Sequence, residues 1–180
     1  MFYCFLADGF EETEAIAPID ILRRAGIRVC TVGVGGSVIR SSHNLYVTAD
    51  INTDQFEINE GIEGVILPGG MPGVTNLYAD ETVLDAVRYC SENDLFVCAI
   101  CAAPMILGKL GIVKGKHATC FPGFEKDLEG AMTTGEHVTV DGKIITAKGA
   151  GCALEFGFAI VEQVRGKKAS DNIAVSMQCR

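Results

Sequence analysis

Short apolar runs alternate with longer amphipathic segments along most of the chain. The runs are rich in β-branched and aromatic residues, as in buried strands, and the segments repeat apolar positions at helical spacing. The predicted strands span residues 2–7, 28–34, 64–67, 95–100, 138–140 and 144–146, with short extended pieces at 37–40 and 46–50. The predicted helices span residues 11–25, 81–92, 102–110, 153–164 and 169–177. This alternation predicts an α/β fold with a mostly parallel sheet covered by helices on both faces.

Residues that start and stop elements support these predictions. Gly26 ends the first predicted helix, and Asp80 is a suitable N-cap for the helix that follows it. Asp141 and Gly142 predict the tight turn of a hairpin. No repeat or linker interrupts the pattern. A length of 180 residues with 48% hydrophobic content therefore predicts one domain, spanning 1–180.

The net charge of −8 narrows the range of partners. Such a charge repels phosphate backbones and anionic lipid surfaces, so we expect neither a nucleic-acid nor a membrane partner. The first residues lack a basic region before their apolar run, and no apolar stretch reaches the roughly 20 residues that cross a bilayer. We therefore expect a cytoplasmic protein.

Eight cysteines in a chain without a secretory signal predict free thiols in a reducing compartment. Cys98 and Cys101 have the C-x-x-C spacing of redox and metal motifs, which is an alternative interpretation. It is disfavoured because Cys98 lies inside the apolar run LFVCAI, whereas a redox motif normally opens a helix.

The segment LFVCAICAAP carries Cys101 from a predicted buried strand directly to the start of a helix. This is the geometry of a nucleophile elbow, which exposes a side chain at the carboxyl edge of an open α/β sheet. Backbone amides at the start of a helix favour a thiolate, so we expect Cys101 to have a lowered pKa and to be reactive. The alternative is a small hydrophobic residue that fills a tight turn.

Two other segments follow strands at the same edge of the predicted sheet. In ILPGGMPG, Gly69 and Gly70 allow backbone amides to approach a reacting oxygen, although an ordinary turn is the alternative. In ADGFEETEA, Glu11, Glu12 and Glu14 begin a helix, where carboxylates interact favourably with the helix dipole. A glutamate that turned inward beside the thiol would have a raised pKa and could exchange a proton with sulfur. Spacing does not choose among the three.

The three histidines, His43, His117 and His137, have no evident partner in the sequence. No two of them have the spacing of metal ligands on a helix or hairpin. We therefore predict no metal site.

Together, ADGFEETEA, LPGGMPG and AICAAP resemble the ThiJ/PfpI superfamily and, within it, the subfamily of the Parkinson-disease-associated protein deglycase. The resemblance extends through RRAGI, GKHAT, VTVDGKIITAKGAG and LEFGFAIVE, and so covers nearly the whole chain. It implies a flavodoxin-like three-layer sandwich, a homodimer and no cofactor. It further implies that Cys101 is the nucleophile, that Glu14 is a protonated acid touching its sulfur, and that the amides of Gly70 and Ala102 form an oxyanion site.

The activity implied by the resemblance is cofactor-independent chemistry on reactive carbonyls. The substrate would be methylglyoxal, converted to lactate, or an early glycation adduct on a protein side chain. An oxidative-stress sensor or chaperone that acts through oxidation of Cys101 is the alternative. A cysteine peptidase is less favoured, because Ala102 stands where the protease-like branch has a histidine. The glutamine amidotransferase branch needs a His–Glu pair, and Glu155 has no histidine two residues before it.

Two departures from the family pattern concern the expected site. Phe121 stands where some relatives have a histidine, which argues against a mechanism with an imidazole base there. His43 stands where other members have an arginine that reaches across the dimer, and we hypothesise that His43 of the partner subunit supplies part of that polarity. Cys120 and Cys152 are candidate resolving thiols, although structural burial is the simpler role. The other residues expected to line the site are Gly69, Cys120, Gly149 and Ala150.

Overall fold

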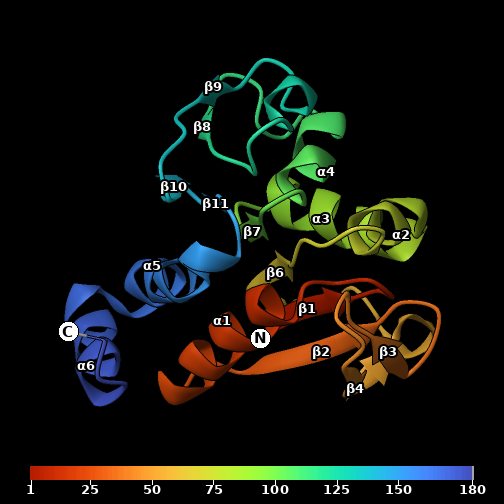
Figure 1. Ribbon diagram of the computed structural model, residues 1–180, viewed down its shortest axis with the longest axis horizontal. Coiled ribbons are helices and arrows are strands. Elements are labelled where there is room, and N and C mark those ends of the chain that lie inside the picture. Colours follow the sequence, from red (N-terminus) through yellow and green to blue (C-terminus); the bar gives the residue numbers. More distant parts are fainter. Residues whose placement is uncertain (180) are drawn as a thin grey trace.

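A seven-stranded sheet lies at the centre of the computed structural model, which describes residues 1–179 (Figure 1). Its strand order is β10-β11-β7-β6-β1-β2-β5, and every neighbouring pair is parallel except β10 with β11. The predicted mostly parallel sheet is therefore confirmed. The strands are β1 (Phe2–Leu6), β2 (Val29–Gly33), β5 (Ile51–Asn52), β6 (Gly64–Leu67), β7 (Phe96–Ile100), β10 (Val138–Asp141) and β11 (Ile144–Ala147).

Helices cover both faces of this sheet (Figure 1). One face carries α1 (Glu12–Arg24), α5 (Ala153–Arg165) and α6 (Lys167–Ser176), and the other carries α2 (Gly73–Ala79), α3 (Glu81–Glu92) and α4 (Pro104–Lys109). Side chains along β1 alternate between the two resulting cores, with Phe2 and Cys4 in one and Tyr3 and Phe5 in the other. Among residues 1–179, no helix has the length and apolar content needed to cross a bilayer.

Short elements connect this framework. They are the hairpin of β3 (Val38–Arg40) and β4 (Tyr46–Thr48), the pair β8 (His117–Ala118) and β9 (Met132–Thr133), and 3-10 turns at Thr53–Gln55, Glu125–Asp127 and Ala150–Cys152. Most predicted boundaries shift by one or two residues, and two of these corrections have a clear cause. The helix expected from Ala102 begins at Pro104, because the chain first turns out of β7. Asp141 pairs with Ile144 at the end of the hairpin ladder, so the tight turn is Gly142 and Lys143.

The order of the strands determines where a ligand can bind. β1 lies between β2 and β6, so the chain leaves β1 in one direction along the sheet and later returns on the other side of it. This is the flavodoxin-like order, and ligands of such sheets bind where the strand order reverses, beyond the carboxyl ends of the strands. The segments that follow β1, β6 and β7 carry Glu14, Gly69 and Cys101 to that edge.

Candidate active site

Cys101 follows β7 in a left-handed backbone conformation, with φ of 65°. This conformation costs roughly 1–2 kcal/mol for a residue with a side chain, and it persists only where the surroundings hold it. The Cys101 backbone N–H donates to the carbonyl oxygen of Ala147 at 2.8 Å, and its own carbonyl accepts from the Phe121 N–H at 2.7 Å. A turn then leads into α4. The elbow predicted from the sequence is present.

Glu14 is the glutamate that turns inward. It lies in the first turn of α1 and is only 1% exposed. The backbone N–H of Gly69 donates to its Oε2 at 2.8 Å. The backbone amide of Ala150 and the Cys101 side chain also form hydrogen bonds with its carboxyl group. The carboxyl group is therefore held against the sulfur by contacts from the segments that follow β6, β7 and β11.

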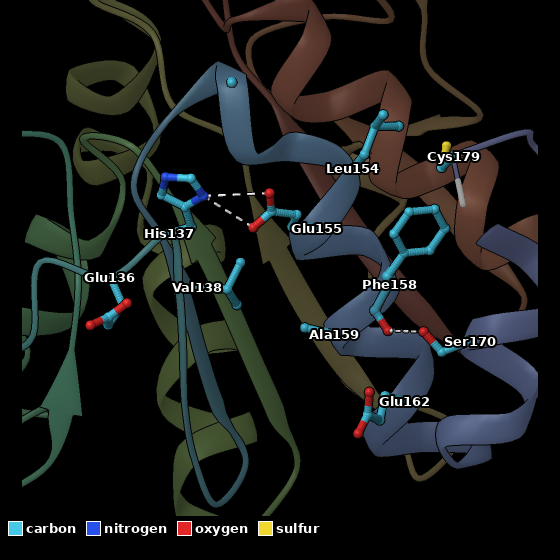
Figure 2. Close-up of a pocket in the computed structure, with 11 residues that line it drawn as sticks. Glu136, His137, Val138, Leu154, Glu155, Phe158, Ala159, Glu162, Ser170 and Cys179 are labelled. Carbon is cyan, nitrogen blue, oxygen red and sulfur yellow. Dashed lines mark hydrogen bonds and ion pairs between the residues drawn. The ribbon is translucent and has the colours of Figure 1, made fainter.

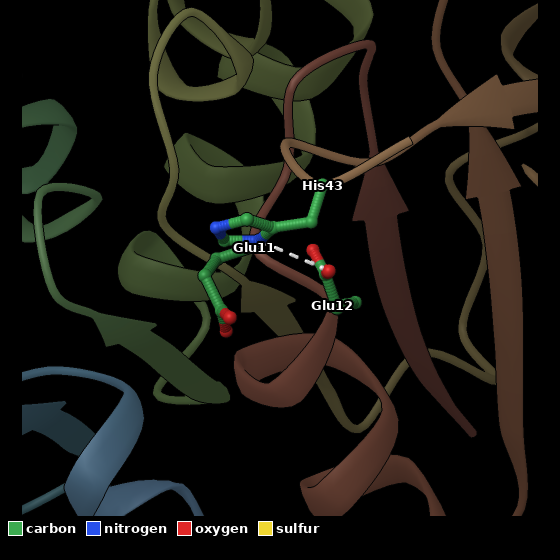
Figure 3. Close-up of side chains that lie close together, drawn as sticks. All are labelled: Glu11, Glu12 and His43. Atoms are coloured by element: carbon green, nitrogen blue, oxygen red, sulfur yellow. Dashed lines mark ion pairs between the residues drawn. The ribbon is translucent and has the colours of Figure 1, made fainter. Parts of the chain in front are cut away.

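The other two glutamates have different partners at the start of α1 (Figure 3). Glu11 is the N-cap residue, and its Oε2 accepts a hydrogen bond from the Glu14 backbone N–H at 2.7 Å. Oε1 of Glu12 lies 3.0 Å from Nδ1 of His43, which is in the loop after β3. One ligand-type atom from each of Glu11, Glu12 and His43 lies within 4.8 Å of the others. Sequence spacing missed this cluster because it joins two elements.

The protein itself uses both carboxylates of this cluster, one as a helix cap and one as a partner of His43. The His43 side chain is 71% exposed and contacts Glu12 and Ser42 of its own chain. That His43 of the partner subunit serves the site stays a prediction, as does the prediction that no metal is needed.

The two glycines after β6 allow the backbone to approach the thiol and the acid. A Cβ atom on Gly69 would collide with Oε2 of Glu14 and would lie 2.6 Å from Cβ of Cys101. Gly70 has φ of 90°, which favours glycine. The backbone amides of Gly70 and Ala102 both hydrogen-bond to the Cys101 sulfur. They therefore converge on the place where a negative charge would develop next to the sulfur.

Burial raises the pKa of Glu14 to about 7, although its hydrogen bond with Cys101 acts in the opposite direction. Burial also raises the pKa of the Cys101 thiol to about 12, and the negative charge and hydrogen bond of ionised Glu14 add to this. The amides of Ala102 and Gly70 lower it. The predicted lowering of the thiol pKa is thus wrong while Glu14 is ionised, because burial and a neighbouring charge outweigh these amides.

The acid and the thiol titrate as a pair. The first proton leaves near pH 7 and leaves a single negative charge between Glu14 and Cys101. When the remaining proton is on Glu14, the like charge is gone and the carboxyl O–H donates to sulfur, which favours the thiolate. The pair can therefore present either a carboxylate base beside a thiol or an acid beside a thiolate.

The remaining residues expected around the site divide into two groups. Phe121 is 46% exposed, and its ring lies 3.4 Å from the position that a Cβ of Gly149 would occupy, next to Ala150. Cys120 and Cys152 are buried, and burial raises the pKa of both, that of Cys120 to about 11. Their environment fits structural thiols better than resolving thiols.

All eight cysteines are free. Cys98 is fully buried in β7, and burial holds the pKa of its thiol well above the ordinary range. It therefore lacks the exposure that a redox or metal-binding C-x-x-C motif requires, in agreement with the interpretation from the sequence. Cys101 is partly exposed.

A cleft of about 750 Å³ lies elsewhere, between β10, α5 and α6 (Figure 2). On its rim, Nδ1 of His137 lies 3.2 Å from Oε2 of Glu155, and both side chains are exposed. His117 similarly lies 3.2 Å from Asp141, so every histidine has a carboxylate partner that the sequence did not reveal. Among the described residues that line it, the cleft has neither a buried acid nor a partly exposed thiol with converging amides, whereas the Cys101 site has both.

The DJ-1/PfpI family matches residues 2–163. The chain is 35% identical over 172 residues to "Protein dj-1beta" of Drosophila melanogaster, which covers 94% of this chain and 91% of that protein. It is 32% identical over 176 residues to the "Parkinson disease protein 7 homolog" of Danio rerio, with coverage of 93% and 91%. The solved structure "Toxoplasma gondii DJ-1, oxidized" has a TM-score of 0.93 at 29% identity and covers 98% of this chain and 97% of its own.

Two relatives from Arabidopsis thaliana are longer, and this chain spans 37% and 44% of their lengths. The sequence likeness runs through the segments that bring Glu14, Gly70 and Cys101 together, and the fold agrees over almost every residue. The chain belongs to the DJ-1/PfpI family.

Proposed function

We propose that the protein is a cofactor-independent enzyme that acts on reactive carbonyls, with Cys101 as its nucleophile. The observation that carries this proposal is the buried Glu14 carboxyl group hydrogen-bonded to the Cys101 side chain, with the amides of Gly70 and Ala102 on the same sulfur. A tight turn needs none of these groups. A nucleophile, an acid or base and two oxyanion donors are what carbonyl addition requires.

The proposed reaction converts a 2-oxoaldehyde and water into a 2-hydroxy acid. The sulfur of Cys101 attacks the aldehyde carbon, and the new oxyanion accepts hydrogen bonds from the amides of Gly70 and Ala102. Glu14 takes the thiol proton during the attack and passes it to this oxyanion, which becomes a hydroxyl. As a carboxylate again, Glu14 removes the proton from the same carbon and returns it to the neighbouring carbonyl carbon, while the hydroxyl proton moves to the neighbouring oxygen. The first carbon is thereby oxidised and the second reduced. The resulting thioester is hydrolysed by water, which releases the acid and restores the thiol. With methylglyoxal the product is lactate.

The experiment is to follow loss of methylglyoxal and appearance of lactate without glutathione. We expect Cys101→Ser to abolish turnover and Glu14→Gln to lower it by at least about a hundredfold, because the proton transfer then has no base. In the wild type, kcat/KM should rise with pH through about 7 as the pair loses its first proton.

Matched controls are Cys30→Ser, a partly buried thiol away from the site, and Glu12→Gln, a carboxylate that faces His43 instead of sulfur. Both should retain turnover. Turnover in Cys101→Ser that equals turnover in the wild type would refute the proposal. Release of free amine from a glycated peptide, measured on the same variants, tests whether an early adduct on a side chain is also a substrate.

A redox sensor is the second candidate, because Cys101 is partly exposed with a hydrogen-bonding acid beside it, while five other thiols are buried. The name of the related Toxoplasma gondii structure records that protein as oxidized. Here peroxide would accept electrons from the thiolate, giving sulfenate and then sulfinate, with water released at each step. Protonated Glu14 would donate a hydrogen bond to the added oxygen.

Intact mass after mild peroxide separates the two candidates. If the protein is a sensor, Cys101 should gain two oxygens in the wild type and equally in the control Cys30→Ser. The rate of this oxidation should be lower in Glu14→Gln. Robust carbonyl turnover with no selective oxidation of Cys101 would exclude the sensor.

The homodimer is also a proposal. Ile16 on α1 and Leu45 and Tyr46 near the hairpin are large apolar side chains that are exposed in the single chain. A second copy that covered them would remove this area from water. Sedimentation equilibrium of the wild type and of Ile16→Glu tests this, and a monomeric wild type would contradict it.

A further inference from the structure

Phe121 places an exposed aromatic ring beside the elbow. Its backbone N–H donates to the Cys101 carbonyl oxygen at 2.7 Å, so the backbone of Phe121 is fixed at the elbow. Its side chain is 46% exposed. The ring lies beside Gly149, whose neighbour Ala150 directs its amide to Glu14. The ring therefore stands between the segment after β7 and the segment after β11, both of which contribute to the site.

The chemistry of the ring limits what it can do. A phenyl ring neither donates nor accepts a proton, so Phe121 takes no part in the proton transfers. It offers an apolar face and a positive edge, which attract a second aromatic group or a bulky hydrocarbon. Gly149 has no side chain to cover the ring at the point of closest approach. The ring thus stays exposed beside the segments that carry Cys101 and Ala150.

The charges around the site also favour a neutral ligand over an anionic one. Glu11 and Glu12 begin α1 beside Glu14, and no lysine or arginine forms an ion pair with any of these three carboxylates among residues 1–179. A substrate with an anionic substituent would be repelled, whereas a neutral apolar substituent would not be.

We propose that Phe121 is a specificity-determining residue that selects 2-oxoaldehydes bearing an aromatic or bulky apolar substituent. This inference rests on the proposed function for its substrate chemistry. The aldehyde carbon bonds to Cys101, and the substituent on the neighbouring carbonyl carbon lies against the ring. For phenylglyoxal the balanced reaction is addition of one water to give mandelate, with the aldehyde carbon oxidised and the ketone carbon reduced.

The contact between the Phe121 ring and the substituent determines how much KM should change when the ring is removed, and why kcat should not. A ring pair contributes the equivalent of about two- to tenfold in affinity beyond the burial of its area. The contact is present in the bound substrate and in the transition state alike, so its loss should raise KM and leave kcat unchanged. Replacing a residue that only supported the fold would instead lower kcat by the same factor for every substrate, because less of the enzyme would be active.

The first experiment compares kcat and KM for phenylglyoxal and methylglyoxal in wild type, Phe121→Ala and Phe121→Leu. We expect Phe121→Ala to raise KM for phenylglyoxal about tenfold with little change for methylglyoxal, and Phe121→Leu to fall between. Tyr78→Ala is the matched control, because Tyr78 is a comparably exposed aromatic residue (38%) near the end of α2. An equal change for both substrates in Phe121→Ala would overturn the inference.

A second measurement makes the inference independent of turnover. Phenacyl chloride and chloroacetone alkylate a thiolate by forming a C–S bond and releasing chloride, and they differ in the phenyl and methyl substituents. Their rates on the peptide that carries Cys101, each divided by the rate with free glutathione, give the selectivity of the site. We expect wild type to favour the phenacyl reagent several-fold and Phe121→Ala to lose this preference.

The two proposals can then fail separately. Absence of turnover together with a phenacyl preference that requires Phe121 would refute the carbonyl enzyme and support the aromatic subsite. Turnover of both aldehydes with no phenacyl preference, or with a preference that survives in Phe121→Ala, would refute the subsite and leave the enzyme standing.

Discussion

Replacing Glu14 with glutamine should change how stability depends on pH. The carboxyl group titrates near 4.5 when it is not perturbed and near 7 in the folded protein, where burial disfavours its charge. Below pH 4.5 both states hold the proton and the group has no effect. Between pH 4.5 and 7 only the folded state holds it, so the unfolded state binds fewer protons and the free energy of unfolding falls as pH rises.

The magnitude follows from the width of that interval. The difference of about 2.5 pKa units corresponds to about 3 kcal/mol, lost between pH 4.5 and pH 7 and constant above it. Glutamine has the same shape, keeps an oxygen to accept from the Gly69 amide, and does not titrate. Stability of the wild type relative to Glu14→Gln should therefore fall by about 3 kcal/mol across this interval.

Urea unfolding at a fixed protein concentration, repeated at several pH values on both proteins, measures this difference. Subtracting the free energy of unfolding of Glu14→Gln from that of the wild type cancels the contribution of other carboxylates. This includes those whose pKa is lowered in the folded protein, such as Asp50, where the Thr31 amide is the chief cause. The same comparison in a Cys101→Ser background identifies the titrating atom, because a serine hydroxyl stays protonated. A difference that is flat with pH would refute the raised pKa of Glu14. A slope that vanishes in the Cys101→Ser background would assign the proton to the thiol.

Three further predictions concern the residues around this pair. Cys101→Gly should be about 1 kcal/mol more stable than Cys101→Ala to urea, because glycine relieves the positive φ despite its greater entropy when unfolded, and equal stabilities would contradict strain at the elbow. Gly69→Ala should displace the Glu14 carboxyl group and cost about 1–3 kcal/mol of stability together with most of the turnover, whereas Gly36→Ala, which has open space, should retain both. His43→Ala should lower turnover and shift the titration of the thiol if His43 of the partner subunit reaches the site, and unchanged values would end that hypothesis.

The sequence predicts best the elements whose ends are set by a helix cap or a proline. The strand at 64–67 and the helix at 81–92 have the predicted bounds, because Pro68 ends the strand and the Asp80 side chain accepts from the backbone of the helix it caps. Most other predicted strands and helices differ from the structure by one or two residues at their ends. The chemistry of a cap or a proline acts over a few residues, so the sequence suffices to locate it.

Other features depend on contacts between distant segments. No helix was predicted at Gly73–Ala79, whose glycine, valine, threonine and asparagine are weak helix formers, and packing against the sheet stabilises it. The partner of each histidine comes from another element, 18 to 31 residues away in the case of His137 with Glu155 and His43 with Glu12. The thiol pKa was misjudged because the sequence shows a helix start but neither the burial of the thiol nor the charge beside it.

The choice between a reactive thiol and a small residue in a tight turn depends on what the rest of the protein contributes at that edge. A structural cysteine would be equally stable beside an apolar neighbour, yet here burial raises the pKa of Glu14 to about 7, which should lower stability at neutral pH by about 3 kcal/mol. The positive φ of Cys101 adds roughly 1–2 kcal/mol to this cost. These are large fractions of the 5–15 kcal/mol that typically stabilises a domain. Two destabilising features, the strained turn and the buried acid, meet at one sulfur, where the bare Gly69 backbone makes room for them. Packing offers no reason for their coincidence, whereas the carbonyl or redox chemistry that we propose for Cys101 would require it.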